Sequence, residues 1–183
     1  MAKEQSFIDY KKALADIDVG YGDYVGDFGA GTAAFFTMEA ARLVGDKGRV
    51  YAVDVVKNVL RAIEGRAVLE GVANVITVWS NLEIYGATKI PDASLDAGIL
   101  VNVLFQSQKK SDIIREIDRT LKPGAKFLIA DWKKRATPLG PPLDLRFDEE
   151  EIRPVMQQLG YREVNLESIG PYHWTMLWVK QGQ

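Results

Sequence analysis

Two carboxylates beside a glycine-rich turn are the residues of this chain with the clearest chemical potential. Asp27 precedes the turn that begins at Gly29, and Asp54 follows that turn by roughly 20 residues. The spacing Gly29-x-Gly31-x-x-Ala34 fits a strand, a tight turn and a helix that bring backbone close to a nucleotide. A carboxylate at the end of the second strand can accept hydrogen bonds from both ribose hydroxyls. The alternative is that Asp54 only caps the next helix.

The charge beside the turn distinguishes between two classes of adenosine-containing cofactor. S-adenosylmethionine (SAM) carries an ammonium and a sulfonium, whereas NAD-type cofactors carry a pyrophosphate. Asp27 would attract the cationic amino acid end of SAM and would repel a pyrophosphate. A chain of 183 residues also leaves no room for the separate substrate domain of a usual dehydrogenase. We therefore expect SAM, and the alternative for Asp27 is a solvated charge at the end of a strand.

Alternating strands and helices are expected to position these residues. Short β-rich runs alternate with longer segments of helical period, which is typical of a parallel sheet covered by helices. The expected strands are 23–28, 48–53, 75–79, 95–103, 126–131, 162–167 and 173–180. The expected helices are 6–17, with Ser6 as its N-cap, 32–44, 57–69, 111–121 and 148–160. Gly170-Pro171 would be a short turn, so the fold class is α/β, a Rossmann-like three-layer sandwich with a seven-stranded, mostly parallel sheet and a C-terminal antiparallel hairpin.

The composition predicts one globular domain, residues 1–183, with 47% hydrophobic and 26% charged residues. A net charge of −2 gives no general attraction for nucleic acid or anionic membranes. The absence of cysteine excludes a disulfide scaffold, a Cys-zinc site and thiol chemistry. No apolar run reaches about 18 residues, and MAKEQSF lacks the apolar stretch of a signal peptide. We expect a cytoplasmic monomer or homodimer without membrane insertion.

The motifs, taken in order, resemble the class I SAM-dependent methyltransferases, in their small single-domain, UbiE-like (type 11) branch. The resemblance covers nearly the whole chain. DFGAGTA resembles the family motif D/E-x-G-x-G-x-G, with Ala33 in place of the last glycine. The segments that resemble the later motifs are VYAVDV (50–55), VWSNLE (78–83), PDASLDAGILVNVLFQ (91–106) and LKPGAKFLIADW (121–132).

This resemblance implies a binding role for each motif residue. The implied SAM contacts are Asp27, Gly29, Ala30, Gly31, Asp54, Val55, Asn81, Leu82 and Val101. Asp54 would bind the ribose, and Val55 and Leu82 would lie beside the adenine. Asn81 stands where the family often has Asp, and its amide can still bond the adenine amino group. S-adenosylhomocysteine would be the product.

Methyl transfer mainly requires that a nucleophile be placed in line with the methyl group. Acceptors are expected at the carboxyl ends of the strands, so Asn102, Phe105 and Gln106 are the expected substrate-binding residues. His173, the only histidine, is a candidate general base or a structural side chain. The proline-rich segment 132–147 is a lid or a rigid surface loop. No metal site is expected.

The identity of the acceptor stays open, although a small molecule is expected. The basic run 133–135 could attract an acidic substrate or be solvated. The segment 102–105 lacks both prolines of the N-P-P-Y/F signature of amino-methylating enzymes, so a nucleic-acid amine is not expected. Two other functions compete: a SAM-binding regulatory or scaffold module without transfer activity, and a nicotinamide-dependent reductase.

Overall fold

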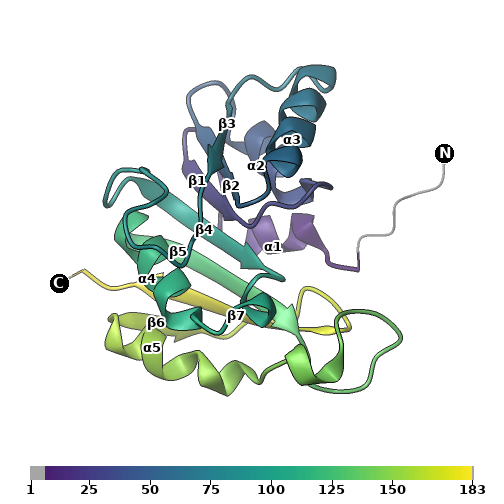
Figure 1. Cartoon of the computed structure of the whole chain (residues 1–183). Coiled ribbons are helices and arrows are strands. Elements are labelled where there is room, and N and C mark those ends of the chain that lie inside the picture. The colour runs from purple at the N-terminus through teal and green to yellow at the C-terminus, as the bar shows by residue number, and fades with distance from the viewer. Residues whose placement is uncertain (1–6, 183) are drawn as a thin grey trace.

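The computed structural model describes residues 7–182, and its elements form one seven-stranded sheet flanked by helices (Figure 1). The strands are β1 (Tyr24–Phe28), β2 (Arg49–Asp54), β3 (Val75–Trp79), β4 (Leu95–Val101), β5 (Leu121–Trp132), β6 (Tyr161–Val164) and β7 (His173–Lys180). The α-helices are α1 (Tyr10–Asp16), α2 (Phe35–Val44), α3 (Lys57–Leu69), α4 (Lys110–Thr120) and α5 (Arg153–Gln158). Short 3₁₀ helices are η1 (Leu104–Gln106), η2 (Leu143–Leu145) and η3 (Glu149–Glu151).

The strand order β3-β2-β1-β4-β5-β7-β6 places β1 at the centre, beside both β2 and β4. All pairings up to β5 are parallel, and β7 is antiparallel to both β5 and β6. From β1 the chain adds β2 and β3 on one side and then returns to add β4 and β5 on the other side, so the strand order reverses between β1 and β4. A crevice for ligands therefore opens where these two strands end.

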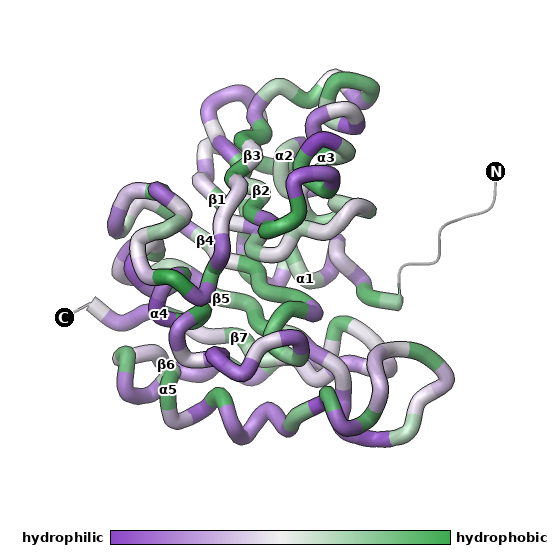
Figure 2. Tube along the Cα trace, in the orientation of Figure 1, coloured by the Kyte–Doolittle hydropathy of each residue, from purple (hydrophilic) through white to green (hydrophobic). Residues whose placement is uncertain are grey.

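Alternating side chains of the central strands supply the core on both faces of the sheet. On β5, Phe127 and Ile129 pack with residues of α4 and α5, whereas Leu128 and Ala130 pack with α1 and α2. Figure 2 shows the hydrophobic colouring concentrated along these inner strands. The three-layer prediction is confirmed. No helix among residues 7–182 is both long and apolar enough to cross a membrane.

Several expected boundaries are wrong by a few residues, because local backbone conformation ends the element. Ala34 adopts a left-handed conformation (φ 45°), so α2 begins at Phe35 and not at residue 32. Asn102 has φ 58°, which ends β4 at Val101 and not at residue 103. The final two strands are antiparallel as expected, but the segment 165–172 joins them in place of a two-residue turn.

The two ends of the chain differ from expectation in their helices. Asp9 caps α1 by accepting a hydrogen bond from the Lys12 amide at 2.9 Å, and the expected cap, Ser6, lies outside the described residues. The expected helix 148–160 is divided into η3 and the short α5.

A buried carboxylate on α4 fixes the loop that follows β3. Glu116 accepts hydrogen bonds from the backbone amides of Gly86 and Thr88 and from the Thr88 hydroxyl. Arg119 donates to both carboxylate oxygens, at 2.6 and 2.8 Å. Burial raises the pKa of Glu116, but these hydrogen bonds together bring it below its ordinary value. The loop that Glu116 anchors begins at Ser80 and includes Asn81 and Leu82, two of the expected SAM-binding residues.

Glu116→Ala is expected to lower the free energy of unfolding by roughly 3–5 kcal/mol, because it removes the buried ion-pair partner of Arg119 and leaves the amides of Gly86 and Thr88 without their acceptor. Urea denaturation measures the change. Arg115→Ala on the same helix is the control, since it removes only the exposed pair with Asp112 and should change stability by less than about 1 kcal/mol. Equal losses in the two variants would contradict the anchoring role of Glu116.

Candidate functional site

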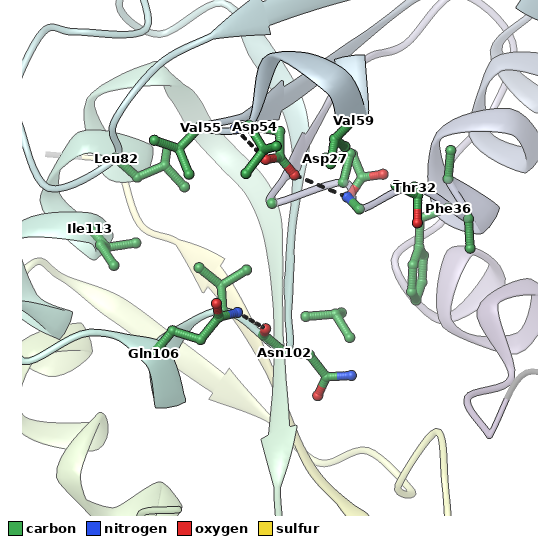
Figure 3. Close-up of a pocket in the computed structure, with 18 of the residues that line it drawn as sticks. Asp27, Thr32, Phe36, Asp54, Val55, Val59, Leu82, Asn102, Gln106 and Ile113 are labelled. Atoms are coloured by element: carbon green, nitrogen blue, oxygen red, sulfur yellow. Dashed lines mark hydrogen bonds between the residues drawn. The ribbon is translucent and has the colours of Figure 1, made fainter. Parts of the chain in front are cut away.

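A cavity of about 870 Å³ opens at the carboxyl ends of the central strands, a size typical of sites for small ligands and cofactors (Figure 3). Most of the residues expected from the sequence to bind a ligand line this one cavity. They are Asp27, Gly29, Ala30, Gly31, Asp54, Val55, Asn81, Leu82, Val101, Asn102, Gln106 and His173. Phe105 is not among the lining residues.

The glycine turn requires its glycines for two different reasons. Gly29 has φ 81°, and a Cβ there would lie 2.3 Å from Val103 Cγ2. Gly31 has φ 63° but has open space around it. The amides of Gly29 and Ala30 both donate to the Val53 carbonyl, at 2.8 and 3.1 Å. The turn is therefore held against the end of β2, and its backbone borders the cavity.

Asp54 receives two backbone amides and does not cap a helix. Its Oδ2 accepts from the Gly31 amide at 3.2 Å, and its Oδ1 accepts from the Val56 amide at 2.8 Å. The N-cap of α3 is Val56, so the helix-capping alternative for Asp54 is wrong. Each carboxylate oxygen can accept a second hydrogen bond, and Asp54 lines the cavity between the turn and Val55 (Figure 3).

Asp27 is a buried carboxylate, only 4% exposed, so it is not a solvated strand-end charge. Its Oδ2 accepts a hydrogen bond from the Thr37 hydroxyl of α2 at 2.5 Å. Burial raises the pKa of Asp27 to about 6, against the opposing effect of the Thr37 bond, and the negative charge of Asp54 adds to the rise. The group therefore has an unusually high affinity for a proton, and a bound cation would satisfy the same charge.

An apolar cleft lies next to the two carboxylates. Leu82 is buried and Val55 is 60% exposed, and both line the cavity. The Trp79 indole donates to the Val55 carbonyl at 3.0 Å, and Asn81 Oδ1 accepts from the Glu83 amide at 2.9 Å. These bonds fix the two walls between which a flat ring could lie.

The segment after β4 presents a polar atom to the opposite side of the cavity. The backbone amide of Asn102 donates to the Ala130 carbonyl, and Gln106 Nε2 donates to the backbone carbonyl of Asn102, both at 3.0 Å. Figure 3 shows the second of these bonds. Asn102 Oδ1 is buried and has no hydrogen-bond partner among the described residues. Asn102 and Gln106 thus lie where a second ligand would meet the first.

Phe105 does not line the cavity, unlike Asn102 and Gln106, with which it was expected to bind the substrate. Its side chain packs against the core cluster beneath α4. Its amide donates to Asp131 Oδ2 at 3.1 Å, which holds η1 to the end of β5. Burial raises the pKa of Asp131 to about 6, although the backbone amides of Trp132 and Phe105 oppose the rise.

The segment 132–147 is folded around one buried guanidinium. Arg146 donates to the carbonyls of Lys133, Arg135, Leu139 and Pro141 and to the Thr137 hydroxyl, at 2.6–3.3 Å. Gly140, at φ 101°, lies against the Trp132 ring, where a Cβ would come within 2.5 Å. These contacts favour the rigid surface loop over the lid.

The cavity has further lining residues that the sequence did not single out as binding residues, among them Phe7, Ile8, Ser80 and Trp132. Ser80 follows β3 and Trp132 is the last residue of β5, so their place at strand ends was the available signal. Phe7 and Ile8 reach the cavity only through the packing of α1, which carries no local sequence signal. Among residues 7–182 no group of three or more His, Asp or Glu side chains is placed to hold a metal ion.

Comparison with known proteins shows similarity to methyltransferases. The model of the methyltransferase domain family (type 11) matches residues 26–129, which run from β1 to β5. The ubiquinone/menaquinone biosynthesis C-methyltransferase UbiE of Azotobacter vinelandii is 31% identical over 119 residues, covering 64% of this chain and 46% of that protein. UbiE of Photorhabdus laumondii is 29% identical over 148 residues, covering 79% and 55%. The chain spans about half the length of these relatives.

Solved structures share the fold over nearly the whole chain. A SAM dependent methyltransferase from Aquifex aeolicus has a TM-score of 0.84 and 25% identity, covering 94% of this chain and 90% of that one. The [4+2]-cyclase SpnF has a TM-score of 0.77 and 16% identity, covering 94% and 79%. Because the second is described as a cyclase, the fold alone does not determine the reaction.

Gly29→Ala is expected to destabilise the protein more than Gly31→Ala, by at least about 1 kcal/mol. Both changes place a side chain at positive φ, which costs roughly 1–2 kcal/mol, but only the first also drives a methyl group into Val103. Urea denaturation of the two variants measures the difference. A Gly31 variant that is equally or less stable would contradict the close approach of the turn to Val103.

Proposed function

This chain belongs to the class I SAM-dependent methyltransferase family, in its type 11, UbiE-like branch, and we propose that it transfers the SAM methyl group to a small-molecule acceptor by in-line displacement. The observation that carries the proposal is the buried Asp27 carboxylate beside the open backbone of the glycine turn. The relatives named UbiE are C-methyltransferases of quinone biosynthesis. We extend only methyl transfer to this chain and leave their acceptor aside.

The residues of the cavity fit SAM group by group. Asp27 would hold the cationic amino acid end, because a carboxylate with a raised pKa gains most from a neighbouring positive charge. Asp54 would accept hydrogen bonds from the ribose hydroxyls with the capacity that its two amide bonds leave. Val55 and Leu82 would enclose the adenine. SAM supplies an activated methyl group, so the protein's task is to orient the acceptor and exclude water.

The same geometry gives less support to the two competing functions. The pyrophosphate of a nicotinamide cofactor would lie near two carboxylates, Asp27 and Asp54, and would be repelled. A regulatory or scaffold module would need the cofactor cleft but no acceptor site, whereas Asn102 and Gln106 extend the cavity beyond that cleft. We further propose a single domain over residues 1–183 that acts in the cytoplasm as a monomer or homodimer, without nucleic-acid partners.

Calorimetry should show that SAM and S-adenosylhomocysteine bind and that NADH does not. Asp54→Ala should weaken SAM by roughly 10–150-fold, because a hydrogen bond to a charged group is worth about 1.5–3 kcal/mol. The control is Asp144→Ala, outside the cavity, which should leave affinity unchanged. A loss below about threefold for Asp54→Ala would remove Asp54 from the site, and preferred binding of NADH would overturn the proposal.

Incubation with SAM and a cell extract, read by mass spectrometry, tests transfer itself. The expected outcome is S-adenosylhomocysteine together with a methylated small molecule. Binding of SAM without either product would favour the regulatory module.

The pH dependence of SAM binding should report Asp27. The ionised carboxylate binds the cation, so affinity should be full above pH 6 and fall by up to about tenfold per pH unit below it. The raised pKa has the opposite sign for folding: its contribution to stability is fully present below pH 3.8 and is lost as pH rises through about 6.

Asp27→Asn should therefore flatten the affinity profile between pH 5 and 7, weaken SAM and raise the melting temperature of the cofactor-free protein at pH 7. Calorimetry and thermal unfolding measure the two effects. An unchanged affinity profile in the variant would show that another group titrates.

A further inference from the structure

His173 is a buried polar side chain that no described residue satisfies. It is 1% exposed, it lines the cavity, and neither Nδ1 nor Nε2 has a hydrogen-bond partner among residues 7–182. Leaving a buried polar atom unpaired costs about 1–3 kcal/mol. Trp174 and Trp178 of the same strand also have buried N–H groups without a partner. Of these three residues only His173 lines the cavity, so a ligand there is a partner that only His173 can gain.

An aromatic wall stands next to this imidazole. Trp132 of β5 is paired in register with His173 of β7, and the two ring centroids are 4.3 Å apart. Gly140 packs against the Trp132 ring, and the guanidinium carbon of Arg146 lies 5.6 Å from the centroid of that ring. The indole and the imidazole therefore form one fixed surface for a ligand.

The charge around this surface is positive. Lys133, Arg135 and Arg146 have no carboxylate partner in the described part of the chain, although it contains many ion pairs. Lys133 Nζ and Arg135 Nη2 both donate to the Pro171 carbonyl, at 3.3 and 3.2 Å. Burial lowers the pKa of His173 to about 4, and the charges of Lys133 and Arg146 contribute. The imidazole is neutral near pH 7, with one donor and one acceptor nitrogen.

Three carboxylates line the cavity: Glu83 is paired with Lys109 at 3.7 Å, and the other two, Asp27 and Asp54, lie at the end away from His173. Asp27 and Asp54 end β1 and β2, and β1 is separated from β7 by β4 and β5. At about 4.8 Å between neighbouring strands, this separation is roughly 14 Å. The end that would hold the cationic cofactor and the end that carries His173 are thus opposite in charge.

We infer that His173 binds the methyl acceptor by a hydrogen bond while the acceptor's body lies against Trp132, and that the bonded group is neutral or anionic and not an ammonium. This inference rests on the proposed function, and it excludes protonated amines as acceptors. It differs from the general base considered from the sequence, because the imidazole here holds the acceptor and takes no proton from it.

The sole histidine makes a direct test available. In protein labelled with ¹⁵N-histidine and saturated with S-adenosylhomocysteine, benzyl alcohol, benzoate and benzylammonium serve as probes of equal shape and different charge. We expect the alcohol and benzoate to shift the imidazole ¹⁵N resonances, and benzylammonium to bind at least about tenfold more weakly. No shift with any probe, or tightest binding of benzylammonium, would overturn the inference.

Two variants and a control complete the test, with probe affinity measured by ligand-detected NMR. His173→Phe should weaken benzyl alcohol at least about fivefold, whereas His173→Gln, which retains a donor and an acceptor, should weaken it less. Trp178→Phe removes a buried, unpartnered N–H that lies outside the cavity; it should lower stability but leave the affinity for benzyl alcohol unchanged.

Equal loss in the control and in His173→Phe would overturn the inference. If a variant does not fold, the wild-type titration decides alone. Failure of S-adenosylhomocysteine itself to bind would instead count against the proposed function.

Discussion

The close approach of Gly29 to its neighbours is the constraint on which the site depends. This one residue follows β1, donates its amide to the Val53 carbonyl of β2 and leaves room for Val103 after β4. The strand ends can converge only because no side chain stands between them. The same convergence brings Asp27 and Asp54 to one wall of the cavity and Asn102 to the other. The cavity is a consequence of this packing and requires no mobile element.

Two buried carboxylates of the same protein show how the site differs from the scaffold. Glu116 is surrounded by amides, a hydroxyl and a guanidinium, and its pKa lies below the ordinary value. Asp27 accepts a hydrogen bond from the Thr37 hydroxyl but has no cationic partner among the described residues, and its pKa rises to about 6. The first arrangement stabilises the fold. The second leaves an electrostatic demand that a cationic ligand can meet, at a cost to the cofactor-free protein.

Sequence reasoning succeeded where spacing along the chain determines the structure. The turn at Gly29 and the carboxylates at strand ends are local features. The family and the seven-stranded, mostly parallel sheet with its antiparallel last strands are confirmed. It did not show that Phe105 would be absent from the cavity lining, because the position of η1 depends on a hydrogen bond to Asp131 of another strand. The folding of 132–147 around Arg146 was equally hidden, since its partners are carbonyl groups that every sequence supplies.

The unsatisfied atoms of this protein are distributed in a way that stability alone does not explain. Apart from two indole nitrogens, the buried side-chain atoms without partners among residues 7–182 belong to Ser80, Asn102 and His173, and all three residues line the cavity. They follow or begin β3, β4 and β7, so they are spread across the sheet and share no packing defect. Each costs free energy in the cofactor-free state. Their common location is accounted for if ligands, the cofactor at one end and the acceptor at the other, supply the missing partners.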